Sequence, residues 1–145
     1  MTWTDVPKNF GLCQRDDCPL AATCLRHICE TLLPERHWQW LYVTRATTSG
    51  YLSSACQAFV SAQPVRVALG FKRALGQVKS AQLPLVRKEL IHTFGHSTKV
   101  YYLARWGGRP LNDEEQRRVE EVFVRYGVEA PVAFDAYEER ILFPD

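Results

Sequence analysis

The sequence predicts an α+β chain that is mainly helical. Three observations support this fold class: apolar residues recur at helical spacing through the second half of the chain, one run is dense in aromatic and β-branched residues, and all five cysteines precede residue 57. We expect a Cys-containing module over residues 1–63 with one short strand or hairpin. Residues 64–145 are expected to form a cluster of about four helices.

The first 63 residues show two predicted elements. A helical pattern covers residues 20–33 and stops at Pro34, which cannot continue a helix. Residues 38–45 are rich in Trp, Tyr, Val and Thr and predict a strand, which the turn-forming residues 47–50 end.

Four helices are predicted after this module, over residues 64–79, 83–94, 98–106 and 113–126. Pro64 suits the first turn of the first helix, and Gly95 and Gly107 are placed to end the next two. Asn112 and Glu115 have the spacing of a capping box at the start of the fourth. The last 18 residues are expected to be extended, with one short strand near residues 132–134.

The net charge of +2 conceals an uneven distribution of charge along the chain. Residues 1–63 carry five basic and five acidic side chains, residues 64–111 carry nine basic against one acidic, and residues 112–145 carry four basic against ten acidic. A folded block with a balance of +8 favours a phosphate-rich partner. The alternative is a solvated helical face whose acidic partners come from the following helix.

Residues 83–106 have the pattern of a helix-turn-helix, in which two helices flank a short turn that contains Gly. In this interpretation the second helix and its N-terminus contact nucleic acid, and basic residues of the two preceding helices contact the phosphate backbone. The predicted nucleic-acid-binding residues are Ser97, Thr98, Lys99, Tyr101, Tyr102 and Arg105, together with Arg87, Lys88, Lys72 and Arg73. A helical cluster with no nucleic-acid partner is the alternative.

Residues 83–108 and 120–128 resemble a pattern in small regulatory proteins of Bacteroidales-type bacteria that carry a helix-turn-helix of the phage-repressor type. The whole chain, with its N-terminal cysteines, also resembles an uncharacterised family of small proteins from the same bacteria. One departure is visible, since residues 56–59 are Cys-Gln-Ala-Phe where that family has Cys-Pro-Phe-Phe. The resemblance implies lineage and a helix-turn-helix-like region; it implies no assigned function.

The cysteine spacing predicts a metal site. Four thiolates suit zinc or a four-cysteine iron–sulfur cluster, and the predicted ligands are Cys13, Cys18, Cys24 and Cys56. His27 is an alternative ligand because it lies one helical turn after Cys24, and Cys29 is the spare thiol. A metal would order a segment that buries little apolar surface. The alternatives are reduced thiols buried in a core with no cofactor, and a redox switch.

No sequence motif of a phosphate loop, a dinucleotide-binding turn or a zinc peptidase is present, so we expect no catalytic activity. No signal peptide or membrane span is evident, and a cytoplasmic protein is expected. The first hypothesis is a metal-stabilised nucleic-acid-binding regulator that acts on DNA, with a homodimer or a protein partner left open. The second is a metal-stabilised protein–protein adaptor, and the third is an iron–sulfur redox or sensor protein.

Overall fold

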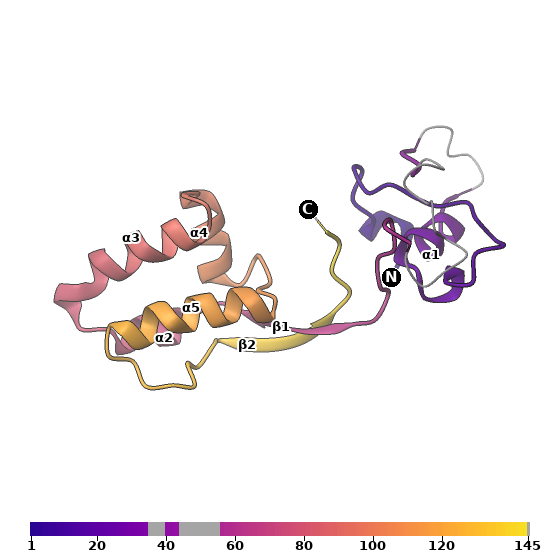
Figure 1. Ribbon diagram of the computed structural model, residues 1–145. Coiled ribbons are helices and arrows are strands. Elements are labelled where there is room, and N and C mark those ends of the chain that lie inside the picture. The colour runs from indigo at the N-terminus through magenta and orange to yellow at the C-terminus, as the bar shows by residue number, and fades with distance from the viewer. Residues whose placement is uncertain (35–39, 44–55, 145) are drawn as a thin grey trace. The chain divides into compact units, whose positions relative to one another are not determined.

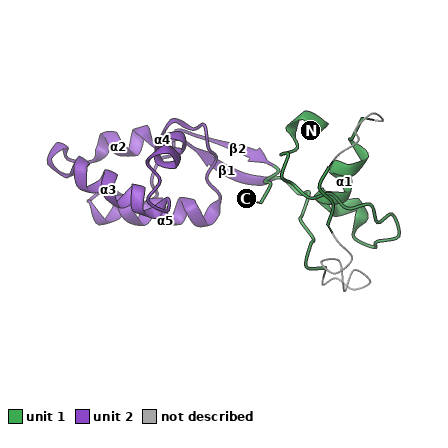
Figure 2. Ribbon diagram, turned by 90° about the horizontal axis from the view of Figure 1, so that it is seen from above, with its two compact units in different colours: residues 1–64, 141–145 green, residues 65–140 purple. Residues whose placement is uncertain are grey.

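A computed structural model describes residues 1–34, 40–43 and 56–144 (Figure 1). The chain forms two compact units, which Figure 2 shows in different colours. Unit 1 comprises Met1–Pro64 and Ile141–Asp145, and unit 2 comprises Val65–Arg140. The described residues contain five α-helices and one antiparallel pair of strands, which confirms the predicted α+β, mainly α class.

Unit 1 has little regular structure in its described part. It contains the short 3-10 helices η1 (Trp3–Asp5) and η2 (Ala21–Thr23) and the helix α1 (Leu25–Thr31). The predicted helix over residues 20–33 is therefore shorter and begins in a 3-10 turn. The predicted strand over 38–45 lies partly outside the described residues, and its described part, 40–43, forms only an isolated parallel bridge from Tyr42 to Leu12.

A small apolar cluster holds unit 1 together. Its buried members are Val6, Phe10, Leu12, Leu25 and Cys29. The C-terminal residues Ile141 and Phe143 pack against it, and the rings of Phe143 and Phe10 meet edge to face with their centroids 4.9 Å apart. The end of the chain is therefore part of the same core as its beginning.

Unit 2 consists of seven elements in chain order. They are β1 (Val65–Leu69), α2 (Lys72–Gln77), η3 (Ser80–Gln82), α3 (Leu83–Thr93), α4 (Thr98–Trp106), α5 (Asp113–Arg125) and β2 (Ala136–Arg140). The two strands pair antiparallel, from Val65 opposite Arg140 to Leu69 opposite Ala136. The first and last segments of unit 2 are thus joined by the sheet, and the helices lie between them in the sequence.

The predicted helix over residues 64–79 is wrong in its first half. Residues 65–69 form β1, and the helix α2 begins only at Lys72, after Gly70 at a φ of +68°. Val67, Phe71 and Ala74 are all buried, so the apolar spacing that suggested one helix comes from a strand, a turn and a helix that face the same core. The strand expected near 132–134 is also misplaced: β2 follows it at 136–140, where every residue is exposed and no alternation marks it.

The helices α3, α4 and α5 agree with the prediction, and their ends have the expected caps. The Ser97 hydroxyl accepts a hydrogen bond from the Val100 N–H at 3.2 Å, and Gly107 ends α4 at a φ of +80°. Asn112 and Glu115 form the capping box, with side-chain to backbone distances of 2.9 and 3.1 Å.

The core of unit 2 is one cluster of sixteen buried residues among those described. Phe71 lies within it, with the ring centroids of Tyr101 and Phe123 both 5.9 Å away. Phe71 follows β1, Tyr101 belongs to α4 and Phe123 to α5, so one side chain ties three segments together. This packing fixes the position of α4, and with it the outward-facing residues of that helix.

Candidate functional sites

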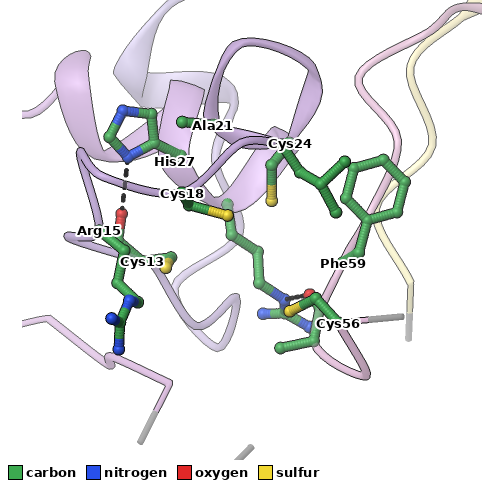
Figure 3. A pocket seen from close by; sticks show the side chains of 11 residues that line it. Cys13, Arg15, Cys18, Ala21, Cys24, His27, Cys56 and Phe59 are labelled. Atoms are coloured by element: carbon green, nitrogen blue, oxygen red, sulfur yellow. Dashed lines mark hydrogen bonds between the residues drawn. The ribbon is translucent and has the colours of Figure 1, made fainter. Parts of the chain in front are cut away.

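A small pocket in unit 1 is lined by four cysteines (Figure 3). They are Cys13, Cys18, Cys24 and Cys56, the set that the spacing predicts as metal ligands. They come from well-separated points of the sequence, and Figure 3 shows their side chains around the same space. The fifth thiol, Cys29, is 0% exposed in the apolar core and does not line the pocket.

The Arg26 side chain connects three chain segments that surround this pocket. It lies on α1, its Nη1 donates to the Gly11 carbonyl at 2.6 Å, and its Nε donates to the Ala58 carbonyl at 2.8 Å. Gly11 is two residues before Cys13, and Ala58 is two residues after Cys56. The guanidinium therefore connects the segments that carry these two cysteines to the helix that follows Cys24.

Backbone hydrogen bonds add to this framework. The Cys13 N–H donates to the Arg26 carbonyl at 3.2 Å, and the Leu25 N–H donates to the Val60 carbonyl at 2.7 Å. Cys24 itself forms an isolated antiparallel bridge with Ser61. The segment after Cys56 is thus fixed beside the start of α1.

Burial disfavours the ionisation of two of the cysteines, Cys13 and Cys29. Burial raises the pKa of the Cys13 thiol, a backbone hydrogen bond from Arg15 opposes this shift, and the neighbouring thiols add a smaller increase. Burial in the core raises the pKa of Cys29 to about 11. At neutral pH these thiols are protonated unless a cation draws off the proton.

As the side chains stand, no group of three or more His, Cys, Asp and Glu residues in the described part of the chain is placed to hold a metal ion. The alternative ligand His27 also lines the pocket, but its Nδ1 lies 3.1 Å from the Cys13 carbonyl and its Nε2 lies 3.7 Å from Asp16. The His27 ring therefore interacts with residues beside the pocket. The dashed line in Figure 3 marks its contact with the Cys13 carbonyl.

A second candidate site lies on α4 in unit 2. Lys99, Tyr102 and Trp106 are spaced by three and four residues and so share one face of this helix. Arg87 of α3 lies over the Tyr102 ring at 5.3 Å. We call the set of Lys72, Arg87, Lys99, Tyr102, Arg105 and Trp106 the basic-aromatic surface.

Trp106 is the member of the basic-aromatic surface that the sequence analysis missed. It is 62% exposed, and both Lys72 and Arg105 place their cationic groups over its ring, at 4.8 and 5.5 Å from the centroid. In the sequence Trp106 is the last residue of the helix predicted over residues 98–106, a position that by itself predicts no role. Its spacing of four residues from Tyr102 was the signal that could have identified it.

Two of the predicted contact residues have other roles. Tyr101 is 1% exposed and belongs to the core, so the prediction that it contacts nucleic acid is wrong. Helical position alone did not separate it from Tyr102, because adjacent residues differ by only about 100° around a helix. The Ser97 hydroxyl serves as the cap of α4. Thr98, Arg73 and Lys88 are exposed.

Four basic side chains of unit 2 form ion pairs, and nine form none with any described residue. Arg109, Arg118, Arg125 and Arg140 form ion pairs with Glu115, Glu114, Glu89 and Glu138. The predicted binding residues Lys72, Arg73, Arg87, Lys88, Lys99 and Arg105 form no ion pair with any described residue.

The acidic C-terminal segment therefore does not neutralise the predicted binding residues. Asp135 instead accepts hydrogen bonds from the Lys72 and Arg73 backbone N–H groups, and Glu120 accepts one from the Val132 N–H. Five acids of this segment, namely Glu114, Glu115, Glu120, Asp135 and Glu138, are thus engaged with backbone groups and with other arginines, which disfavours the solvated-face alternative.

These features define a small, mainly helical protein with a cysteine-lined pocket in one unit and a basic, aromatic surface in the other. The sequence model of a family described as Family of unknown function (DUF6078) matches residues 1–143. The chain belongs to this family. No curated protein and no solved structure matches the chain. Within the described segments, no helix has the length and apolar character that crossing a membrane requires.

Proposed function

We propose that the protein binds nucleic acid through the basic-aromatic surface of unit 2, as a cytoplasmic regulator that acts on DNA and has no catalytic activity of its own. In this proposal unit 1 is a metal-stabilised module. One observation carries the proposal: nine of the thirteen basic side chains of unit 2, among them all six basic residues of the predicted binding set, form no ion pair with a described residue, although the same unit is rich in acids.

The chemistry of this surface suits a polyanion that also carries aromatic rings. Lysine and arginine contact phosphates, and their release of counterions makes binding sensitive to salt. Tyr102 and Trp106 add aromatic faces next to those cations, which suits stacking on unpaired bases. The helix pair α3 and α4, joined across residues 94–97, supports the helix-turn-helix interpretation of the same region.

An acidic protein partner is the second candidate, because uncompensated cations would also attract carboxylates. The exposed ring of Trp106 favours nucleic acid, since a planar base can stack on it. The two candidates predict different ligands for the same surface, and a direct binding assay separates them.

The test is the binding of a fluorescently labelled oligonucleotide to the full chain, measured by anisotropy over a range of salt concentrations, with single-stranded and duplex forms. The test variant is Lys72→Glu with Lys99→Glu, two exposed residues of the surface. We expect at least about tenfold weaker binding near 0.1 M salt and a shallower salt dependence, by roughly two phosphate contacts.

The matched control is Arg117→Glu with Arg118→Glu, which changes the net charge equally but lies on the acidic helix α5. This control should bind about as well as the unmodified protein, and thermal unfolding of all three proteins verifies their folding. Equal losses of affinity in both double variants would show that net charge, rather than this particular surface, determines the binding. An absence of binding to every oligonucleotide, with capture of a polyglutamate peptide, would overturn the proposal in favour of the adaptor.

A further inference from the structure

We propose that Cys13, Cys18, Cys24 and Cys56 together bind one zinc ion, which acts as a structural centre of unit 1. The evidence is their convergence: four cysteines spread over more than forty residues of sequence line one pocket, while the fifth is buried elsewhere. This inference concerns unit 1 and does not depend on nucleic-acid binding by unit 2.

The ligand set suits zinc. Four thiolates in a tetrahedral arrangement are a common structural zinc site, and soft sulfur ligands exclude magnesium and calcium. Cys13 and Cys18 are separated by four residues, within the spacing usual for a pair of ligands on one loop. Cys24 precedes α1 directly, and Cys56 comes from the segment that Arg26 ties to that helix.

The pocket is large enough for a single ion. Its cavity volume is about 20 Å³, and about 10–15 Å³ holds one water molecule.

The charges around the pocket also favour a thiolate centre. One Zn²⁺ with four thiolates carries a net charge of −2, and two arginines, Arg15 and Arg26, line the same pocket. Arg15 also pairs with Asp17 at 3.5 Å, and the two guanidinium groups partly offset the negative charge of that centre.

Zinc binding draws the four sulfur atoms closer than they stand, since no three described ligands are yet placed to hold an ion. Because Arg26 and the backbone bridges hold the cysteine-bearing segments beside one another, we expect this step to need side-chain rotation and small loop adjustments. Each thiol gives up one proton to solvent when its sulfur binds the ion, so four protons leave for each zinc bound.

The test uses the full chain, freed of metal under reducing conditions and titrated with zinc in the presence of a competing chelator. We expect one zinc per chain, and cobalt(II) in place of zinc should give the sulfur-to-cobalt charge-transfer band of a four-thiolate site. Serine substitution at each of the four positions should weaken zinc binding by at least about a hundredfold, more than outer-shell changes usually do.

Cys29→Ala is the matched control, because it removes the one thiol that does not line the pocket. It should leave the zinc stoichiometry at one. Zinc lost equally in Cys29→Ala and the four variants, or no stoichiometric zinc in the unmodified chain, would overturn the proposal. So would iron with a brown colour, or zinc that is lost in His27→Ala and kept in one of the serine variants. The cobalt spectrum of the unmodified chain decides the matter even where a variant fails to fold.

Discussion

Unit 1 and unit 2 are stabilised to very different degrees by apolar burial. Among the described residues, the core of unit 2 has sixteen buried members and that of unit 1 has five, one of them a cysteine. Unit 2 has four α-helices and a pair of strands, whereas the described part of unit 1 has one seven-residue helix. The described part of unit 1 buries little apolar surface, and the zinc centre proposed above would add stability to it, as metals do in small modules.

The largest effect that we expect in unit 2 comes from its aromatic centre. Phe71→Ala removes a fully buried ring that contacts Tyr101 and Phe123, and it should lower the free energy of unfolding by about 3–5 kcal/mol. Denaturant unfolding followed by circular dichroism measures this. If unit 2 depends on its own core, zinc affinity should stay unchanged in the same variant, and a parallel loss of zinc would contradict the independence of the two units.

The next effect concerns binding by the exposed ring of Trp106. Trp106→Ala should weaken the binding of a single-stranded oligonucleotide by about 1–3 kcal/mol if a base stacks on the ring. Trp106→Phe, which keeps an aromatic face, should recover part of that loss. If Trp106→Ala and the unmodified protein bind equally well, the ring contributes nothing to the affinity and the basic side chains account for the binding.

A smaller loss should follow from removing the cap of α5. Asn112→Ala deletes the acceptor for the Glu115 N–H and should cost about 1 kcal/mol of unfolding free energy, measured by thermal or urea unfolding. Asn112→Ser restores a capping oxygen and should recover most of it. A loss of several kcal/mol would show that Asn112 does more than cap the helix.

The last prediction concerns pH: the burial of Cys29 should make unit 1 less stable in alkaline solution. The folded-state pKa of Cys29, about 11, is raised by burial above its ordinary value of 9.0. Its contribution to stability is therefore complete below pH 9 and is lost as the pH rises toward 11. Alkylation followed by mass spectrometry should find Cys29 the slowest of the five thiols in the metal-free native protein, and rapid modification of it at pH 8 would contradict its burial.

Much of unit 2 could be predicted because its signals are local. The helices α3, α4 and α5 have apolar stripes with Ser97, Asn112 and Gly107 at their ends, and each cap acts within one turn of the chain. The strand β1 could not be predicted in this way, since its partner β2 lies about seventy residues later and is exposed throughout. Pairing at that distance leaves no periodic pattern in either segment alone.

Prediction of the two candidate sites has the same limit, because it too depends on contacts between residues distant in the sequence. The sequence prediction set Cys29 apart from the four cysteines of the pocket, although the helix near residue 20 on which it relied begins only at Leu25. The roles of Tyr101 and Trp106 depend on how α4 packs against Phe71, and neighbouring aromatic residues on one helix cannot be assigned to core or surface without that packing. The Arg26 guanidinium donates hydrogen bonds to residues fifteen and thirty-two positions away in the sequence. No local sequence pattern indicates these contacts.

The difference between the two units is tested most directly by amide hydrogen exchange on the full chain, to which the proposed zinc is added and then removed by a chelator. We predict that the amides of α1 and of the segments around Cys13, Cys24 and Cys56 lose protection, while those of α3, α4 and α5 keep theirs. Protection that stays unchanged in unit 1 would show that its small core suffices without metal. Protection lost in both units together would show that they form a single cooperative structure.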